Sequence, residues 1–238
     1  MEETHSTIHG LIADYTCEKC GASQKVNIFP CINFSQNPEY YPLVRDLSVF
    51  RVKCEKCGAE RVIQFDTLLI DEEHKYFLYL LSDKALYNRF KYQITYFIET
   101  VLNKDDKYDL SKFRTRLVYS PNDLIEKMSI FECGLDDEVI EILKCSMFDK
   151  GVVDRAVYDC LHFDGMTGAD LGFVAFSSRT STKEPVKLII RFPFYNKVID
   201  DLANFRNRHR DYFEVIDEEW VRSKFDRHSG KPSGEQGK

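Results

Sequence analysis

The sequence predicts an α+β fold from three observations. A twofold cysteine motif is flanked by strand-like segments, a central stretch has helical periodicity, and the last third returns to strand-like segments. With 238 residues, 43% of them hydrophobic and 13% aromatic, the chain is long enough to bury a substantial core. Its net charge of −6 disfavours nonspecific binding to nucleic acid or to an anionic membrane.

The hydropathy pattern predicts a cytoplasmic protein with no membrane partner. No apolar run approaches the ~20 residues that span a bilayer. The first ten residues, MEETHSTIHG, lack the basic and then apolar pattern of a signal peptide. In a reducing compartment the eight cysteines are expected to be metal ligands or buried thiols rather than disulfides.

Four of the cysteines form two similar motifs, Cys17-Glu18-Lys19-Cys20-Gly21 and Cys54-Glu55-Lys56-Cys57-Gly58. A two-residue spacer lets both thiolates of a pair reach one metal ion, and the glycine permits a backbone turn with positive φ. Four thiolates complete the tetrahedral shell of zinc. We therefore expect one structural Zn²⁺, bound by Cys17, Cys20, Cys54 and Cys57. Four thiolates also accept iron, and the sequence does not separate the two metals.

The competing interpretation of a Cys-x-x-Cys motif is thiol redox chemistry, in which the motif opens a helix after a strand. Here the segments 26–29 and 61–65, which follow the two pairs, resemble strands. This favours a zinc ribbon, in which each cysteine pair lies in the turn of a β-hairpin (a knuckle). The single cysteines are expected to be small core residues: Cys31, Cys133, Cys145 and Cys160.

Periodicity predicts the elements of the first half. Residues 11–32 and 49–82 are expected to form strands around the knuckles, including a hairpin of 62–70 with 76–81. From residue 83 apolar residues recur every three or four positions, which predicts an amphipathic helix over 83–103.

The second half alternates between helix and strand signals. After a strand at 113–119, Ser120 and Pro121 supply a cap and a first helical residue, which predicts a helix ending near Gly134. Three acidic residues at 136–138 favour the start of another helix, running to about residue 148. An antiparallel meander of three strands is then expected at 156–163, 171–176 and 186–192. It is followed by a helix at 193–205, a short strand at 213–216 and a helical turn at 217–221.

These elements suggest a division of the chain into regions. We expect a zinc-ribbon-like region over 1–82 and an α+β region over 83–226 that packs with it, as a second domain or as part of one continuous domain. Residues 227–238, rich in glycine, serine and lysine, are expected to form a tail.

Three stretches resemble the CpXC-domain proteins, a bacterial family with a presumed zinc-binding region at the N-terminus. They are the two knuckles with the following segment 65–69 (FDTLL), the segment 116–127 (RLVYSPNDLIEK) and the segment 130–141 (IFECGLDDEVIE). The resemblance covers about residues 12–145 and implies that the four paired cysteines are metal ligands. The family's first knuckle usually has proline after its first cysteine, where this chain has Glu18. The family's role is itself unassigned, so the resemblance implies a fold and a metal but no activity.

The leading functional hypothesis is a non-catalytic module that binds a protein partner. A site of four cysteines leaves zinc no open position, and we find no set of nucleophile, base and orienting group, so no catalytic residue is predicted. The run Asp71-Glu72-Glu73-His74 places carboxylates beside a histidine, but it falls at a predicted hairpin turn, where solvated charges are expected.

Two alternatives from other classes remain open. The first is nucleic-acid binding by the ribbon, but residues 1–70 hold seven basic residues against nine acidic ones, which argues against it. The basic residues beside the knuckles are Lys19, Lys25, Lys53, Lys56 and Arg61. The second is an enzyme with its site in the C-terminal α+β half, which a deep pocket with convergent polar groups would support.

Overall fold

The computed structural model confirms the predicted α+β class. It describes residues 10–104, 106–180, 183–203 and 212–225, so the expected tail at 227–238 lies outside the described residues. None of the helices in these ranges is long and apolar enough to cross a membrane.

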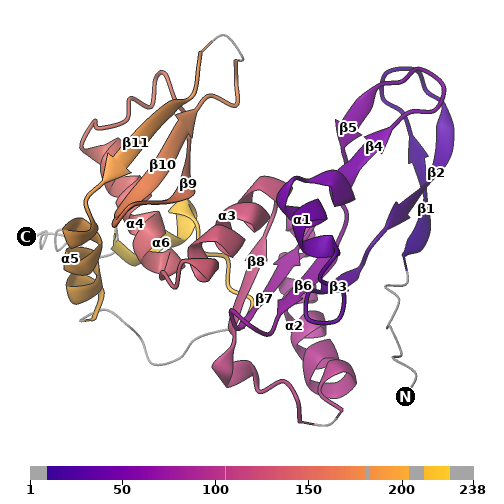
Figure 1. Cartoon of the computed structure of the whole chain (residues 1–238), viewed down its shortest axis with the longest axis horizontal. Coiled ribbons are helices and arrows are strands. Elements are labelled where there is room, and N and C mark those ends of the chain that lie inside the picture. Colours follow the sequence, from indigo (N-terminus) through magenta and orange to yellow (C-terminus); the bar gives the residue numbers. More distant parts are fainter. Residues whose placement is uncertain (1–9, 105, 181–182, 204–211, 226–238) are drawn as a thin grey trace, which may run out of the picture. The chain divides into compact units, whose positions relative to one another are not determined.

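The chain forms two compact units, each considered by itself. Unit 1 comprises residues 1–132 and 209–214, and unit 2 comprises residues 133–208 and 215–238. The ribbon and a four-stranded sheet belong to unit 1, and a three-stranded sheet belongs to unit 2 (Figure 1). The division after residue 82 remains a prediction.

The ribbon consists of two antiparallel hairpins, as expected around the knuckles. Its strands are β1 (Leu11–Thr16), β2 (Ser23–Ile28), β4 (Arg51–Lys53) and β5 (Glu60–Val62). β1 pairs with β2 and β4 pairs with β5, so each cysteine pair lies in the turn of its own hairpin. Between the hairpins lie α1 (Tyr40–Arg45) and a 3₁₀ turn (Ser48–Phe50).

The four-stranded sheet forms the core of unit 1. Its strands, in spatial order, are β3 (Cys31–Asn33), β6 (Thr67–Asp71), β7 (Tyr76–Leu80) and β8 (Arg114–Val118). β6 and β7 form the predicted antiparallel hairpin, whereas β3 and β8 pair in parallel with their neighbours. Every residue of the two central strands is buried, as is typical of strands covered on both faces.

Successive side chains of β7 point to opposite faces of the sheet, where they pack against two different helices. Tyr76 lies on one face and meets Phe131 of α3 (Pro121–Glu132), with ring centroids 5.7 Å apart. Tyr79 lies on the other face, against Phe90 of α2 (Tyr87–Phe97), at 6.1 Å. The two helices therefore cover opposite faces of the sheet.

The predicted helix at 83–103 is present, with distinct turns at both ends. It begins with a 3₁₀ turn (Lys84–Leu86), continues as α2 and ends in a π-helical turn (Ile98–Leu102). The Asp83 side chain accepts a hydrogen bond from the Ala85 amide and caps the start. A second 3₁₀ turn (Leu110–Lys112) precedes β8.

In its described residues, unit 2 contains the predicted meander and three helices. Strands β9 (Cys160–Thr167), β10 (Asp170–Phe176) and β11 (Val186–Ile190) are antiparallel, in the order β11-β10-β9. The helices are α4 (Asp137–Asp149), α5 (Phe192–Ala203) and α6 (Glu218–Phe225). Asp136 caps α4 through the Glu138 amide at 3.0 Å, as the acidic run predicts.

Two expectations near the C-terminus need correction. The strand expected at 213–216 is reduced to a single parallel bridge between Glu214 and Arg116 of β8. The closing turn at 217–221 extends into the eight-residue helix α6, which the Asp149–Arg222 ion pair at 2.6 Å joins to α4.

Candidate metal centre

The two knuckles have the same backbone geometry. In the first, the Gly21 amide donates to the Cys17 carbonyl at 2.8 Å; in the second, the Gly58 amide donates to the Cys54 carbonyl at 2.9 Å. Gly21 and Gly58 have φ angles of 69° and 68°, a left-handed conformation that disfavours any residue with a Cβ. The glycine after each second cysteine thus lets the chain reverse within one turn.

The folded ribbon brings the four thiols together. The Cys17 and Cys57 Sγ atoms are 3.8 Å apart, the Cys20 and Cys54 Sγ atoms are 3.7 Å apart, and all four lie within 4.8 Å of one another. A tetrahedral ion with bonds of about 2.3 Å to sulfur holds its ligands about 3.8 Å apart. All four cysteines are free, so no disulfide competes for these sulfurs. Number, softness and spacing of the donors fit a zinc-type metal ion.

A side chain also bridges the two knuckles. Gln24 of β2 donates through Nε2 to the Lys53 carbonyl at 3.0 Å, and its Oε1 accepts from the Glu55 amide at 3.0 Å. These two bonds fix the second knuckle against the strand that follows the first. This contact has no signature in the sequence, because a glutamine on an exposed strand has no distinguishing pattern.

The pKa values of two thiols show the electrostatic conflict among four adjacent sulfurs. The backbone amide of Cys57, aided by that of Lys56, lowers the pKa of Cys54 to about 6. For Cys20, the Ala22 amide acts in the same direction, but burial and the neighbouring thiols outweigh it and raise the pKa to about 11. One thiolate is therefore favoured while further ones are opposed, and a bound divalent cation relieves that opposition.

The remaining cysteines lie outside this cluster and differ in environment. Cys145 of α4 is buried, as expected, and Cys31 and Cys160 are half-buried. Cys133 is exposed, which contradicts the expected core position: it follows the last residue of α3, where the helix side chains leave the core.

The Asp71–His74 turn is less solvated than its sequence suggested. Asp71 is 4% exposed and accepts hydrogen bonds from the amides of Glu73 and His74 and from the His74 Nδ1 atom, at 2.8 to 2.9 Å. These bonds close the β6–β7 hairpin. Asp71 and His74 thus form an oriented carboxylate–imidazole pair, where the sequence predicts solvated charges.

Two buried polar atoms beside this pair lack a hydrogen-bond partner within the described ranges, the Tyr76 hydroxyl and Glu132 Oε1. Burial raises the pKa of Tyr76, and the charges of Asp71 and Glu132 raise it further. Burial also raises the pKa of Glu132, although Arg45 and the Tyr41 hydroxyl, at 3.7 and 3.0 Å from its Oε2, oppose this. The Glu132 carboxyl group, near the hairpin end of the sheet, is therefore shifted toward its protonated form.

On the other side of the hairpin, Glu72 is in the opposite situation. Its Oε1 accepts from Lys107 Nζ at 2.7 Å, from the Tyr108 hydroxyl at 2.8 Å and from Asn33 Nδ2 at 3.1 Å. Burial raises the pKa of Glu72, but these three donors outweigh it, and the net shift is downward. The carboxylate is thereby held in its charged form.

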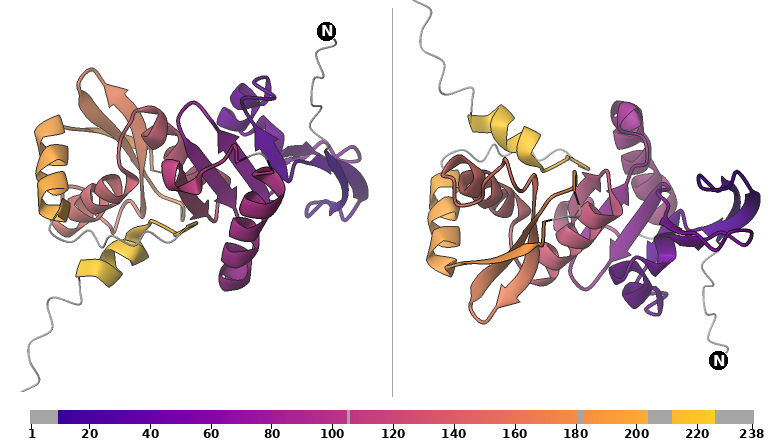
Figure 2. Two further views of the ribbon diagram at one scale, coloured as in Figure 1. Left: turned by 90° about the horizontal axis from the view of Figure 1, so that it is seen from below. Right: turned by 90° about the horizontal axis from the view of Figure 1, so that it is seen from above.

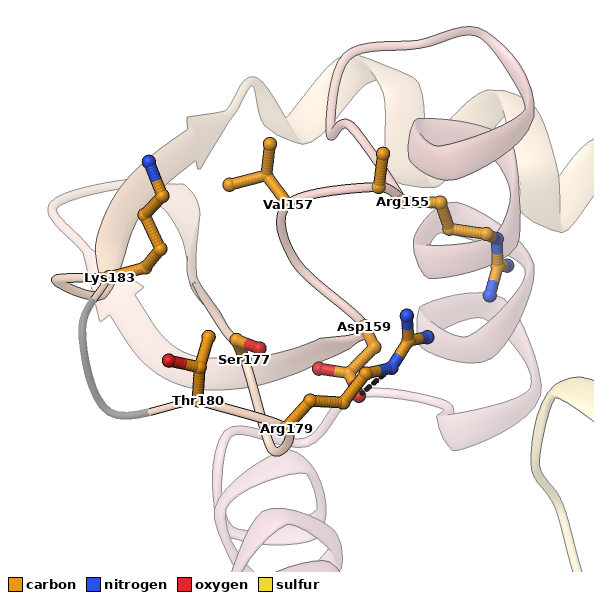
Figure 3. A pocket seen from close by; sticks show the side chains of 8 residues that line it. Arg155, Val157, Asp159, Ser177, Arg179, Thr180 and Lys183 are labelled. Carbon is orange, nitrogen blue, oxygen red and sulfur yellow. Dashed lines mark ion pairs between the residues drawn. The ribbon is translucent and has the colours of Figure 1, made fainter.

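Unit 2 contains a small cavity of about 180 Å³ (Figure 3). It is lined by Arg155, Ala156, Val157, Asp159, Ser177, Arg179, Thr180 and Lys183. Arg179 pairs with Asp159 at 3.1 Å and Arg155 with Glu218 at 2.7 Å, while Figure 3 shows the Arg155 and Lys183 head groups pointing to opposite sides. It is not the deep pocket with convergent polar groups that the enzyme hypothesis needs.

Comparison with known proteins agrees with the cysteine geometry. The family model described as CpXC protein matches residues 15–144, a segment that includes all four clustered cysteines, the β6–β7 hairpin and α3. No curated protein and no solved structure matches the chain. The matched segment covers more than half of the sequence, and the chain therefore belongs to the CpXC family.

Proposed function

We propose that Cys17, Cys20, Cys54 and Cys57 bind one Zn²⁺ as a structural ion, and that the chain is a non-catalytic protein-interaction module whose ribbon this ion stabilises. The observation that carries the metal assignment is the pair of Sγ–Sγ distances, 3.8 and 3.7 Å, which match the edges of a zinc–thiolate tetrahedron. Four protein ligands close the shell, so the ion has no position left for water or substrate.

The ribbon's own packing supports a structural role for the ion. β1, β2 and β5 contain no buried residue, and Val52 is the one buried residue of β4. A segment that buries so little cannot offset its ordering entropy by the hydrophobic effect alone. Metal binding supplies that free energy in small thiolate sites, on the order of 10 kcal/mol.

Features of the two units' surfaces support the proposed interaction role. A closed metal shell and a cavity without convergent groups give little basis for turnover, whereas exposed aromatic side chains are typical of binding surfaces. The net charge of −6 favours a protein partner over nucleic acid.

Native mass spectrometry of the untagged protein, purified gently from its own host, tests both parts. We expect a mass excess of one zinc ion, lost together with ribbon structure on chelation, and a colourless protein, because zinc has no ligand-field transitions. A coloured protein that contains iron would correct the identity of the metal but leave its structural role intact. An apo protein that stays folded with a disulfide in each cysteine pair would support redox chemistry instead. A turnover activity that persists through rigorous purification would contradict the interaction role.

A further inference from the structure

β8 is the last strand of the four-stranded sheet, so in the described part of the chain no strand of that sheet lies beyond it. The Arg114 amide, at its start, donates to the carbonyl of Lys75 next to β7, at 2.8 Å. Because alternate residues of a strand direct their backbone groups to opposite sides, Thr115 and Leu117 direct theirs to the outer edge. Such an edge is a template for a further strand.

Residues 213 and 214, here called the 213–214 segment, lie against this outer edge (Figure 2). They belong to the same compact unit as the sheet. The Leu117 amide donates to the Glu214 carbonyl at 3.3 Å, and the Phe213 amide donates to the Thr115 hydroxyl at 3.1 Å. The Phe213 side chain is fully buried. The segment therefore occupies the β8 edge and is anchored there by one aromatic side chain.

The 213–214 segment does not use the edge as a regular strand would. In a parallel ladder the Thr115 amide would donate to the carbonyl of Tyr212, two residues before Glu214. This bond is not formed, although the structure describes both residues. The cause is the backbone of Phe213, whose φ of 54° departs from the extended conformation.

The conformation of Phe213 also indicates strain. A left-handed backbone is unusual for a bulky residue and persists only where other contacts impose it, here the burial of the ring. The sequence of residues 213–216, FEVI, is rich in strand-forming residues, yet it makes a single bridge. The 213–214 segment thus makes fewer contacts than the edge can offer, and a continuous strand that makes them all has an advantage over it.

We propose that the outer edge of β8 is a strand-acceptor site, which the 213–214 segment occupies in cis and which a protein partner occupies by replacing it with an extended segment. The partner's segment carries an aromatic residue at the place of Phe213, because that buried position takes a ring. In this mode of recognition backbone hydrogen bonds supply affinity and side-chain pockets supply specificity. This inference rests on the proposed interaction role and names its surface.

The same contacts favour a different protein over a second copy of the chain. Two copies that exchanged their 213–214 segments would remake the contacts that each copy already has, and association costs translational and rotational freedom. A strand from another protein can add the bond to the Thr115 amide that the 213–214 segment lacks. Only such a strand offsets the cost of association with new contacts.

Fluorescence anisotropy with the full chain tests the acceptor site. The probe is a labelled synthetic peptide, DYFEVIDE, with the sequence of residues 211–218, which is free to extend. We expect it to bind Phe213→Ala at least about tenfold more tightly than the native chain, because the native segment competes for the edge. Phe194→Ala, the same change at an exposed phenylalanine, should bind the peptide as the native chain does. Alanine in place of the peptide's phenylalanine should weaken binding at least about tenfold.

Hydrogen exchange locates the bound peptide. In Phe213→Ala the Leu117 amide should lose protection and regain it when the peptide is added, whereas the Arg114 amide should stay protected throughout. Protection of β6 and β7 verifies that the variant is folded. If it is not, Phe213→Leu, which keeps an apolar side chain, should give the same changes at a smaller size.

Native mass spectrometry of complexes purified from the host tests the partner. We expect Phe213→Ala to retain a protein partner at least about tenfold more than the native chain does, and the peptide to release it. Equal retention by both forms, without release by the peptide, would keep the interaction role and overturn this inference. No retained partner with either form would contradict the interaction role and, with it, the partner assignment.

Two outcomes would overturn the site itself or its occupant. If folded Phe213→Ala did not bind the peptide, or kept its Leu117 amide protected, the β8 edge would not be an acceptor. If Phe213→Ala formed a dimer that protects the Leu117 amide without peptide, a second copy would be the occupant instead of another protein.

Discussion

In the ribbon, β1 and β2 contain no buried residue, whereas every residue of β6 and β7 is buried, although both regions belong to the same compact unit. β1 and β2 alternate between exposed and half-exposed side chains, and β4 and β5 together bury Val52 alone, so the ribbon lacks an apolar face of its own. The sheet instead has helices on both faces. The proposed function therefore implies that one region depends on four thiols and the ion they fit, whereas the other depends on removal of apolar area from water.

The largest expected effect separates the two regions. Cys20→Ser removes one ligand, and we expect the metal to be lost and the ribbon to unfold, because the metal term is on the order of 10 kcal/mol. Hydrogen exchange should show loss of amide protection in β1, β2, β4 and β5. Protection in β6 and β7 should persist, since their burial does not depend on the ion.

The matched control is Cys133→Ser, which changes an exposed cysteine outside the cluster. It should keep both the metal and the protection of the ribbon. If Cys20→Ser also removed protection from the central strands, the two regions would share one source of stability, and the comparison would be wrong.

The second expected effect is a loss of stability in the sheet while the metal site is kept. Phe77 is fully buried against Tyr108 and Phe113, at ring distances of 5.5 and 4.7 Å, so Phe77→Ala should lower the free energy of unfolding by about 3 to 5 kcal/mol. Urea titration measures this loss, and native mass spectrometry should still find the metal in the folded fraction. Ile12→Ala, a truncation on an exposed ribbon strand, should cost less than about 0.5 kcal/mol.

The difference between the regions also explains what the sequence could predict. The cysteine cluster was predictable to the residue, because two cysteine pairs and their glycines are a local pattern with one main physical meaning. The β6–β7 hairpin and the helices were predictable for the same reason: periodicity and capping residues such as Ser120 and Asp136 act within a few positions.

Contacts between distant segments were not predictable. Three-residue β3 pairs in parallel with β6, and β8 pairs in parallel with β7, across connections whose length and content do not specify a neighbour. The Gln24 bridge and the Glu72 network join residues 29 to 39 positions apart. No single-sequence pattern marks these pairs, because each partner is an ordinary polar residue until the fold brings it into place.

The smallest expected effect concerns two carboxyl groups near the β6–β7 hairpin whose pKa values are shifted in opposite directions, that of Glu72 downward by its hydrogen-bond donors and that of Glu132 upward by burial. Glu72, whose donors hold its pKa below the usual range, contributes stability above its unfolded pKa and loses it as the pH falls through its folded pKa. Glu72→Gln should therefore destabilise the protein by about 1 to 2 kcal/mol near neutral pH, and the difference from the native protein should shrink in acid.

Glu132→Gln is the counterpart, and its pH dependence should have the opposite sign. Because burial holds the pKa of Glu132 above the usual range, its native form is favoured in acid and loses stability as the pH rises through its folded pKa. The native protein's advantage over Glu132→Gln should thus fall with rising pH, by on the order of 1 kcal/mol. Urea unfolding from about pH 4 to about pH 8 measures both differences, and acid loss of the metal cancels because both variants keep the four cysteines. The two stability differences, native protein minus Glu72→Gln and native protein minus Glu132→Gln, should change with pH in opposite directions. If both changed in the same direction, the pH dependence would come from the metal site or from net charge, and the local environments of the two carboxyl groups would not explain it.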